Sequence, residues 1–128
     1  MKLEIKSDPA NLKFVRKKVE DFCKENQLNI DILKAKLAVD EALQNIIRYA
    51  YDFDKSKDII IKIEKTNLNN LKVELRDFGK RVSTSQIKPR DLDDIKPGGL
   101  GIHFIKSIVK GMSYEHQDDG GTLLTLNF

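Results

Sequence analysis

Two polar side chains, Glu41 and Asn45, have types and a spacing that could do chemistry together. They lie in the run 37–51, whose apolar residues recur at helical spacing. Residues four apart on a helix project from the same face. A carboxylate that can accept a proton would then lie beside an amide oxygen that can bind a metal ion. Asn45 has apolar neighbours, so we expect it at the margin of the core, where an amide needs a partner.

Two glycine-containing segments downstream carry groups that suit a nucleotide. Asp77 ends an expected strand, where its carboxylate could accept a hydrogen bond from an exocyclic amine such as that of adenine, and Gly79 would let a flat ring approach the backbone. The segment 98–101, Gly-Gly-Leu-Gly, opens an expected helix, whose first amides and partial positive charge attract phosphate. Taken alone, each segment is equally natural as a strand-end turn or a hinge.

These residues must be positioned by alternating helices and strands. Leu3 and Ile5 alternate with charged residues, which predicts a strand. Ser7 or Asp8 caps an expected helix that runs to about Asn26. Asn29 or Asp31 caps a second one, with inward-facing apolar residues Leu33, Leu37, Leu43, Ile46, Ile47 and Ala50.

The rest of the chain predicts a hairpin, a loop, a helix and a second hairpin. Strands are expected at 59–64 and 71–77, and the polar stretch 80–97 is typical of a lid loop. The helix that follows ends at Gly111, and strands 112–118 and 122–128 flank the turn 119–121. The predicted fold class is α+β, a two-layer sandwich of a mostly antiparallel sheet with helices on one face.

Composition bounds the function classes. The 128 residues, without a linker or repeat, predict a single domain spanning 1–128. A net charge of +3 gives little support for direct nucleic-acid binding. No apolar run approaches the ~20 residues of a membrane span, so we expect no membrane partner and a cytoplasmic location. Cys23, the only cysteine, is expected to be a buried thiol, and His103 and His116 to be structural or surface residues.

The order of the motifs resembles the ATP-binding superfamily of gyrase, the heat-shock chaperone, histidine kinases and the mismatch-repair ATPase. The order is a helix with Glu41 and Asn45, a strand-end Asp77, a lid, and a glycine-rich helix start. Within that superfamily, the runs 41–51 and 98–102 look most like the small bacterial anti-sigma factor serine/threonine kinases of partner-switching systems. The resemblance covers nearly the whole chain and implies a Bergerat-type ATP-binding fold.

The resemblance also implies a role for each matching residue. Glu41 would be the general base, and Asn45 would bind ATP through Mg²⁺. Arg16, in the first helix, would contact the partner protein. The remaining ATP-binding positions would be Asp77 and Gly79 at adenine, Thr122 in support of Asp77, and Gly98, Gly99, Leu100 and Gly101 at the phosphates. The loop 80–97 would be the ATP lid.

The function implied is that of an anti-sigma factor. It would bind ATP, phosphorylate a serine or threonine of an anti-sigma factor antagonist, and sequester a sigma factor, as a homodimer. The alternative is a non-catalytic module that binds a partner with nucleotide or without it. Arg81 supports this alternative, because it stands where many relatives have a second motif glycine. A third alternative, a basic nucleic-acid-binding domain suggested by the pI of about 8.9, has no supporting motif.

Overall fold

The computed structural model describes residues 1–80 and 101–128. The expected lid from Arg81 onward and the glycine-rich positions 98–100 lie outside these residues. Five strands form one sheet: β1 (Lys2–Lys6), β2 (Asp58–Lys65), β3 (Leu71–Asp77), β4 (Gly111–His116) and β5 (Thr122–Asn127). The helices are α1 (Leu12–Glu25), α2 (Ile32–Asn45) and α3 (Gly101–Ile108), with a 3-10 turn η1 (Pro9–Asn11) before α1 and a π-helical turn η2 (Ile46–Ala50) after α2.

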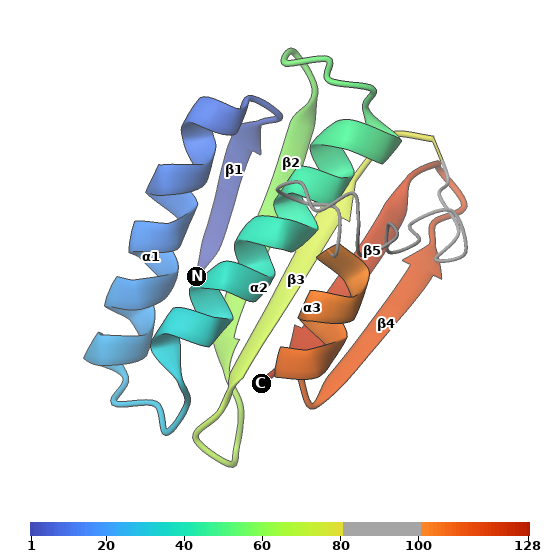
Figure 1. The fold of residues 1–128 in the computed structure, drawn as a ribbon. Helices are drawn as coiled ribbons and strands as arrows, with labels where there is room; N and C mark the ends of the chain where they lie inside the picture. Colours follow the sequence, from blue (N-terminus) through green and yellow to red (C-terminus); the bar gives the residue numbers. More distant parts are fainter. Residues whose placement is uncertain (81–100) are drawn as a thin grey trace, which may run out of the picture.

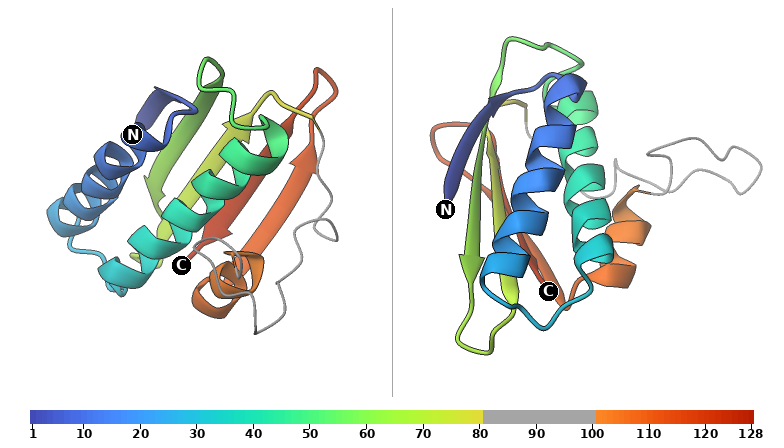
Figure 2. Two further views of the ribbon diagram at one scale, coloured as in Figure 1. Left: turned by 45° about the horizontal axis from the view of Figure 1, so that its top comes forward. Right: turned by 90° about the vertical axis from the view of Figure 1, so that its left-hand side faces the viewer.

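The sheet has the order β1-β2-β3-β5-β4, and every neighbouring pair is antiparallel. The three α-helices lie on one side of it, as Figure 1 and the edge-on view in Figure 2 show. The predicted α+β sandwich is therefore confirmed. No helix in the described part of the chain is long and apolar enough to cross a membrane.

The helix starts follow the capping groups in the sequence. The carboxylate of Asp8 accepts a hydrogen bond from the amide of Ala10 at 3.0 Å, at the beginning of η1. Asp31, one of the two caps expected for the second helix, accepts one from the amide of Lys34 at 3.1 Å. Each satisfies a backbone donor that has no partner within its helix. The Asp31 cap fixes where α2 begins and therefore where Glu41 and Asn45 lie along it.

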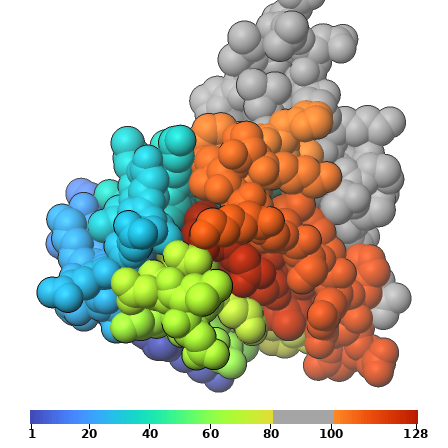
Figure 3. Space-filling model, turned by 90° about the horizontal axis from the view of Figure 1, so that it is seen from below, coloured from blue at the N-terminus to red at the C-terminus, as the bar shows by residue number. Residues whose placement is uncertain are grey.

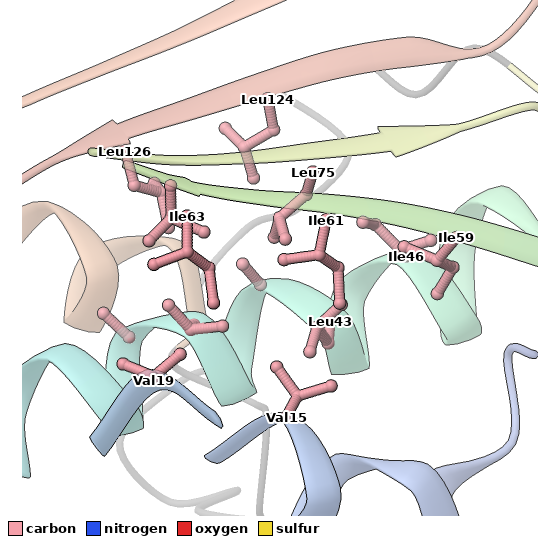
Figure 4. Packing of buried hydrophobic residues seen from close by; sticks show 14 of the residues in the cluster. Val15, Val19, Leu43, Ile46, Ile59, Ile61, Ile63, Leu75, Leu124 and Leu126 are labelled. Atoms are coloured by element: carbon pink, nitrogen blue, oxygen red, sulfur yellow. The ribbon is translucent and has the colours of Figure 1, made fainter. Parts of the chain in front are cut away.

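The core fills the space between the helices and one face of the sheet. Alternate residues of the central strands point toward the helices and are buried, and the intervening residues face the other side. Figure 4 shows this packing of α1 and α2 against the sheet. The fully buried side chains include Val15, Val19, Leu43, Ile59, Ile61, Ile63, Leu75 and Leu126.

The inward face of α2 differs from the one expected. Leu33 and Leu37 were expected to point inward, but 63% and 40% of their surfaces are exposed. The buried stripe instead contains small residues, Ala35, Ala38 and Ala42, together with Val39 and Leu43. Small side chains let a helix approach its neighbours closely, and both α1 and α3 pack against α2. The expectation was wrong at Leu33 and Leu37, because it gave large leucines precedence over the alanines. It is confirmed at the other four positions, which are buried: Leu43, Ile46, Ile47 and Ala50.

Candidate functional site

Glu41 and Asn45 lie together on α2, at the edge of the core. Only 5% of Asn45 is exposed, and its amide Oδ1 and Nδ2 atoms are both buried without a hydrogen-bond partner among the described residues. The same holds for Oε2 of Glu41. A buried polar atom without a partner is costly, so three in one place point to a polar ligand.

The first residue of α3 closes against this pair. A Cβ atom placed on Gly101 would lie 3.0 Å from Nδ2 and 3.1 Å from Oδ1 of Asn45, and 3.2 Å from Oε2 of Glu41. Any larger residue at Gly101 would therefore press on both side chains. The structure thus brings Gly101, Glu41 and Asn45 together from elements that are far apart in the sequence.

The electrostatic surroundings raise the pKa of Glu41 above its ordinary value. Burial is the main cause, because it disfavours the charged form, and the nearby charge of Asp40 adds to it. The positive charge of Arg48 opposes both. A carboxylate whose pKa is moved toward neutrality is a stronger base than an ordinary glutamate, which suits it to accept a proton.

Asp77 enters the site because it continues the buried row of β3. It is paired with Thr122 across the sheet, and both residues are buried on the helix-covered face. Burial raises the pKa of Asp77, although hydrogen bonds from the backbone amides of Gly79 and Thr122 favour its charged form. The Gly79 amide lies 3.0 Å from Oδ1. The hydroxyl of Thr122 is also 3.3 Å from Nδ1 of His116, an otherwise exposed residue.

The π-helical turn η2 holds the end of β3 in place. Its wider backbone, with a hydrogen bond from the Tyr51 amide to the Ile46 carbonyl at 3.1 Å, follows directly on Asn45. The buried hydroxyl of Tyr51 accepts from the Phe78 amide at 2.7 Å and donates to the Asp58 carbonyl at 2.6 Å. Turns of this kind are frequent at functional sites. Here the turn ties the helix that carries Asn45 to the strand that carries Asp77.

Gly79 packs tightly against the same turn. A Cβ atom at Gly79 would lie 2.3 Å from the carbonyl oxygen of Ala50 and 2.9 Å from the ring of Tyr51. The Ala50 carbonyl also accepts a hydrogen bond from the Lys80 amide at 3.1 Å. Close packing therefore requires a glycine here, and room for a flat ring remains a prediction.

A pocket between α2, η2 and the sheet is lined by Asn45, Asp77 and Thr122 but not by Glu41, Gly79 or Gly101. Its empty space, including the open solvent at its mouth, is about 370 Å³. Its lining is mostly apolar, with Asn45, Asp77 and Thr122 as buried polar groups, which suits a flat heteroaromatic ring held by a few hydrogen bonds. The other lining residues are Ala42, Ile46, Tyr49, Ala50, Lys80, Tyr114 and Leu124.

The sequence reasoning had not placed Tyr49 and Tyr114 at the site, whereas Lys80 is the first residue of the expected lid. Tyr114 alternates inward on β4, opposite Leu124, and this period-two position was the available signal. Burial raises the pKa of Tyr114 to about 12, so its hydroxyl stays neutral. Tyr49 depends on the π-helical turn, for which the sequence gives no signal.

Arg16 lies away from this pocket. Its guanidinium forms an ion pair with the carboxylate of Asp40 at 2.5 Å, which links α1 to α2. The second carboxylate oxygen of Asp40 accepts a hydrogen bond from Gln44 at 2.7 Å. Arg16 is still partly exposed, with 37% of its side chain accessible, so the expected contact with a partner protein stays a prediction.

The described residues contain no group of three or more His, Cys, Asp or Glu side chains that could hold a metal ion by themselves. A Mg²⁺ ion that enters with a nucleotide does not need such a group, since phosphate oxygens and water supply most of its ligands. The partnerless buried Oδ1 of Asn45 is a suitable single protein ligand. The residues present therefore fit the metal.

The site of this α+β domain thus combines the buried Asp77 at the end of β3, the partnerless amide of Asn45 at the end of α2 and Gly101 at the start of α3, an arrangement that suits a nucleotide. Comparison with known proteins agrees. The sequence pattern described as "Histidine kinase-like ATPase domain" matches residues 5–128. The chain belongs to this family, and its nucleotide-binding ATPase fold follows from that membership.

The similar proteins include a kinase. The serine/threonine-protein kinase BtrW of Bordetella bronchiseptica is 31% identical over 94 residues, which cover 70% of this chain and 65% of BtrW. The crystal structure of the RsbU and RsbW domains of Rv1364c from Mycobacterium tuberculosis superposes with a TM-score of 0.61 at 18% identity, over 99% of this chain and 32% of that chain. The histidine kinase domain of a blue-light activated kinase from Erythrobacter litoralis gives 0.56 at 14% identity, over 94% of this chain and 59% of that chain. The resemblance stated from the motifs is confirmed at the level of the family.

Proposed function

We propose that this chain is an anti-sigma factor with protein serine/threonine kinase activity. It would bind ATP with Mg²⁺, phosphorylate a serine or threonine of an anti-sigma factor antagonist, and sequester a sigma factor. The observation that carries the proposal is the group of three buried, partnerless polar atoms on Glu41 and Asn45 beside Gly101. The similarity to the kinase BtrW supports transfer to a protein hydroxyl.

Different residues of the chain would have different roles in ATP binding and in phosphoryl transfer. Asp77 would hold the exocyclic amine of adenine in the pocket between η2 and the sheet, and the apolar lining would cover the ring. Gly101, at the start of α3, lies close against Asn45 and Glu41, and the backbone at this helix start would face the phosphates. Glu41 would accept the proton of the attacking hydroxyl, a task that its raised pKa favours. Mg²⁺, when held by Asn45, would neutralise phosphate charge.

The test compares the wild-type chain with Glu41→Gln. Each is incubated with radiolabelled Mg-ATP and a heat-inactivated protein extract of the source cells, and label on serine or threonine is measured. We expect transfer by the wild type and a loss of about 100-fold or more in the variant, since general-base catalysis contributes on that scale. ATP affinity, measured by calorimetry, should stay within about twofold.

Glu25→Gln is the matched control, because Glu25 is exposed at the end of α1. It should transfer phosphate like the wild type. Equal transfer by Glu41→Gln and the wild type would contradict the assignment of the base. Nucleotide binding by the wild type without transfer to any protein would favour the non-catalytic alternative.

A further inference from the structure

A second concave site lies at the end of the molecule opposite the nucleotide pocket. It is a groove between the start of α2, the end of α3 and the end of β5, and its empty space, including the open solvent above it, is about 540 Å³. Figure 3, which views the molecule from below, shows the red end of the chain set deep between cyan, yellow-green and orange segments. Thr122, in the nucleotide pocket, begins β5, and Phe128, in the groove, follows its last residue. The two sites are therefore separate.

The floor of the groove is apolar and fixed in place. Ile30, Ile108 and Phe128 line it, and only 7% of Phe128 is exposed. The Phe128 amide donates a hydrogen bond to the Leu71 carbonyl at 2.9 Å, and the Lys110 amide donates one to the Asn127 carbonyl at 2.7 Å. These bonds hold the floor to the sheet, so the groove exists before anything binds and can take a large apolar side chain.

The rim of the groove carries two cations and one carboxylate, so its side chains have a net positive charge. Lys34 and Lys110 both line it and are exposed, and neither forms an ion pair within residues 1–80 and 101–128. The carboxylate of Asp31 also lines the groove and accepts a hydrogen bond from the Lys34 amide as the cap of α2, so it offsets part of the positive charge. The segment 101–110 that forms the other wall contains no acidic residue. The charge of the rim therefore complements carboxylates.

Two exposed apolar side chains belong to the segments that border the groove, although neither lines it. Leu33 is 63% exposed beside Lys34, and Leu68, at the tip of the β2–β3 turn, is 82% exposed. This turn is held to the groove wall, because the Asn29 amide donates to the Asn69 carbonyl at 3.3 Å and the Asn69 side chain donates to the Gln27 carbonyl at 3.0 Å. Apolar residues around a preformed groove with a charged rim are typical of a protein interaction site.

We infer that this groove binds a segment of a partner protein, in which one large apolar side chain is flanked by acidic residues. The apolar side chain enters between Ile30, Ile108 and Phe128, and the carboxylates pair with Lys34 and Lys110. The inference does not depend on the kinase activity, because the groove shares no lining residue with the nucleotide pocket.

The test uses three blocked pentapeptides and the ¹⁵N-labelled chain, followed by NMR. The probe has phenylalanine between two pairs of glutamates. The comparison peptides replace the phenylalanine by alanine or the glutamates by lysines. We expect saturable shifts of the amide signals of Ile30, Lys34 and Ile108 with the probe, and binding at least about tenfold weaker for both comparison peptides.

A double charge reversal tests the rim. The double variant Lys34→Glu with Lys110→Glu should bind the probe peptide at least about tenfold more weakly than the wild type. The matched double variant Lys55→Glu with Lys57→Glu, which changes exposed residues in the loop before β2, should bind it with unchanged affinity. Equal binding of the lysine peptide, or no shifts in the groove at about 10 mM probe, would overturn the inference. Shifts of the same signals on dilution of the protein alone would assign the groove to a second copy of the chain and would also overturn it.

Discussion

At the scale of single residues, the site combines groups that folding alone would not favour. Asn45 keeps a buried amide without a partner, and Glu41 and Asp77 are carboxylates whose pKa values burial raises. Each costs stability in a chain without ligand. Buried, strained or unsatisfied groups gathered at one place are typical of functional sites, because a ligand satisfies them.

The raised pKa of Glu41 predicts how stability depends on pH. The folded state binds the proton of Glu41 more tightly than the unfolded state, where the pKa is near its ordinary value of 4.5. The contribution of Glu41 to stability therefore decreases as pH rises from below 4.5 through its higher folded pKa, and is least favourable at neutral pH. Glu41→Gln should melt at a higher temperature than the wild type at neutral pH.

The difference between the two melting temperatures should shrink as the pH falls below about 4.5, where Glu41 is protonated in both states. Thermal melts over this range, followed by circular dichroism, measure it, with Glu25→Gln as a control that shows no such trend. A difference that is the same at every pH would show that the variant acts through packing or new hydrogen bonds instead.

At the scale of secondary-structure elements, the site lies where the ends of two elements meet the start of a third. Asn45 ends α2, Asp77 ends β3 and Gly101 begins α3. The turn η2 connects the first two through Tyr51 and Ala50, whose hydrogen bonds reach the residues after β3. A change in this junction should therefore affect stability as well as nucleotide binding.

Gly79→Ala tests the junction. Its new methyl group would lie 2.3 Å from the Ala50 carbonyl, so the backbone of η2 or of the segment after β3 must move. We expect a loss of about 2 kcal/mol or more in the free energy of unfolding, measured by urea denaturation. Gly111→Ala is the control, since its methyl group would meet only the side chain of Asn127 at 3.8 Å and should change stability little. Equal stability of Gly79→Ala and the wild type would contradict this prediction, since it would mean that the backbone near the Ala50 carbonyl shifts without cost.

Sequence patterns predicted the elements better than the contacts between them. The alternation on β3 and β5 placed Asp77 and Thr122 on the buried face, because a strand has only two faces. The register of α2 was less certain, and the exposed Leu33 and Leu37 show that the alanines determine it. The π-helical turn could not be predicted, since it depends on tertiary hydrogen bonds of Tyr51.

At the scale of the whole molecule, two possible binding sites lie at opposite ends of strand β5. The six residues of β5 span about 20 Å, at about 3.3 Å per residue, between the nucleotide pocket and the lower groove. One cluster of buried hydrophobic residues from α1, α2, α3 and the strands forms the core of the molecule. A single packed core of this kind is expected to unfold as one unit.

The reactivity of the Cys23 thiol measures whether the core unfolds as one unit. Its side chain is 1% exposed, and burial raises its pKa to about 11, so the folded chain should react slowly with a thiol reagent at about pH 8. Reaction in increasing urea should accelerate in parallel with the loss of helical circular dichroism. Mg-ATP should slow the reaction below the transition, because a ligand of the folded state stabilises it. Fast labelling in the absence of urea would show that the end of α1 opens independently.

The most direct test of the account is calorimetry with Mg-ATP on the wild-type chain, on Asn45→Ala and on the control Asn26→Ala, which alters a partly exposed residue at the end of α1. The account predicts saturable binding by the wild type and the control, and affinity reduced by about tenfold or more in Asn45→Ala, because this variant lacks the buried amide that we propose as the metal ligand. No heat and no thermal shift at millimolar Mg-ATP for the folded wild type, or equal affinity for all three proteins, would contradict it.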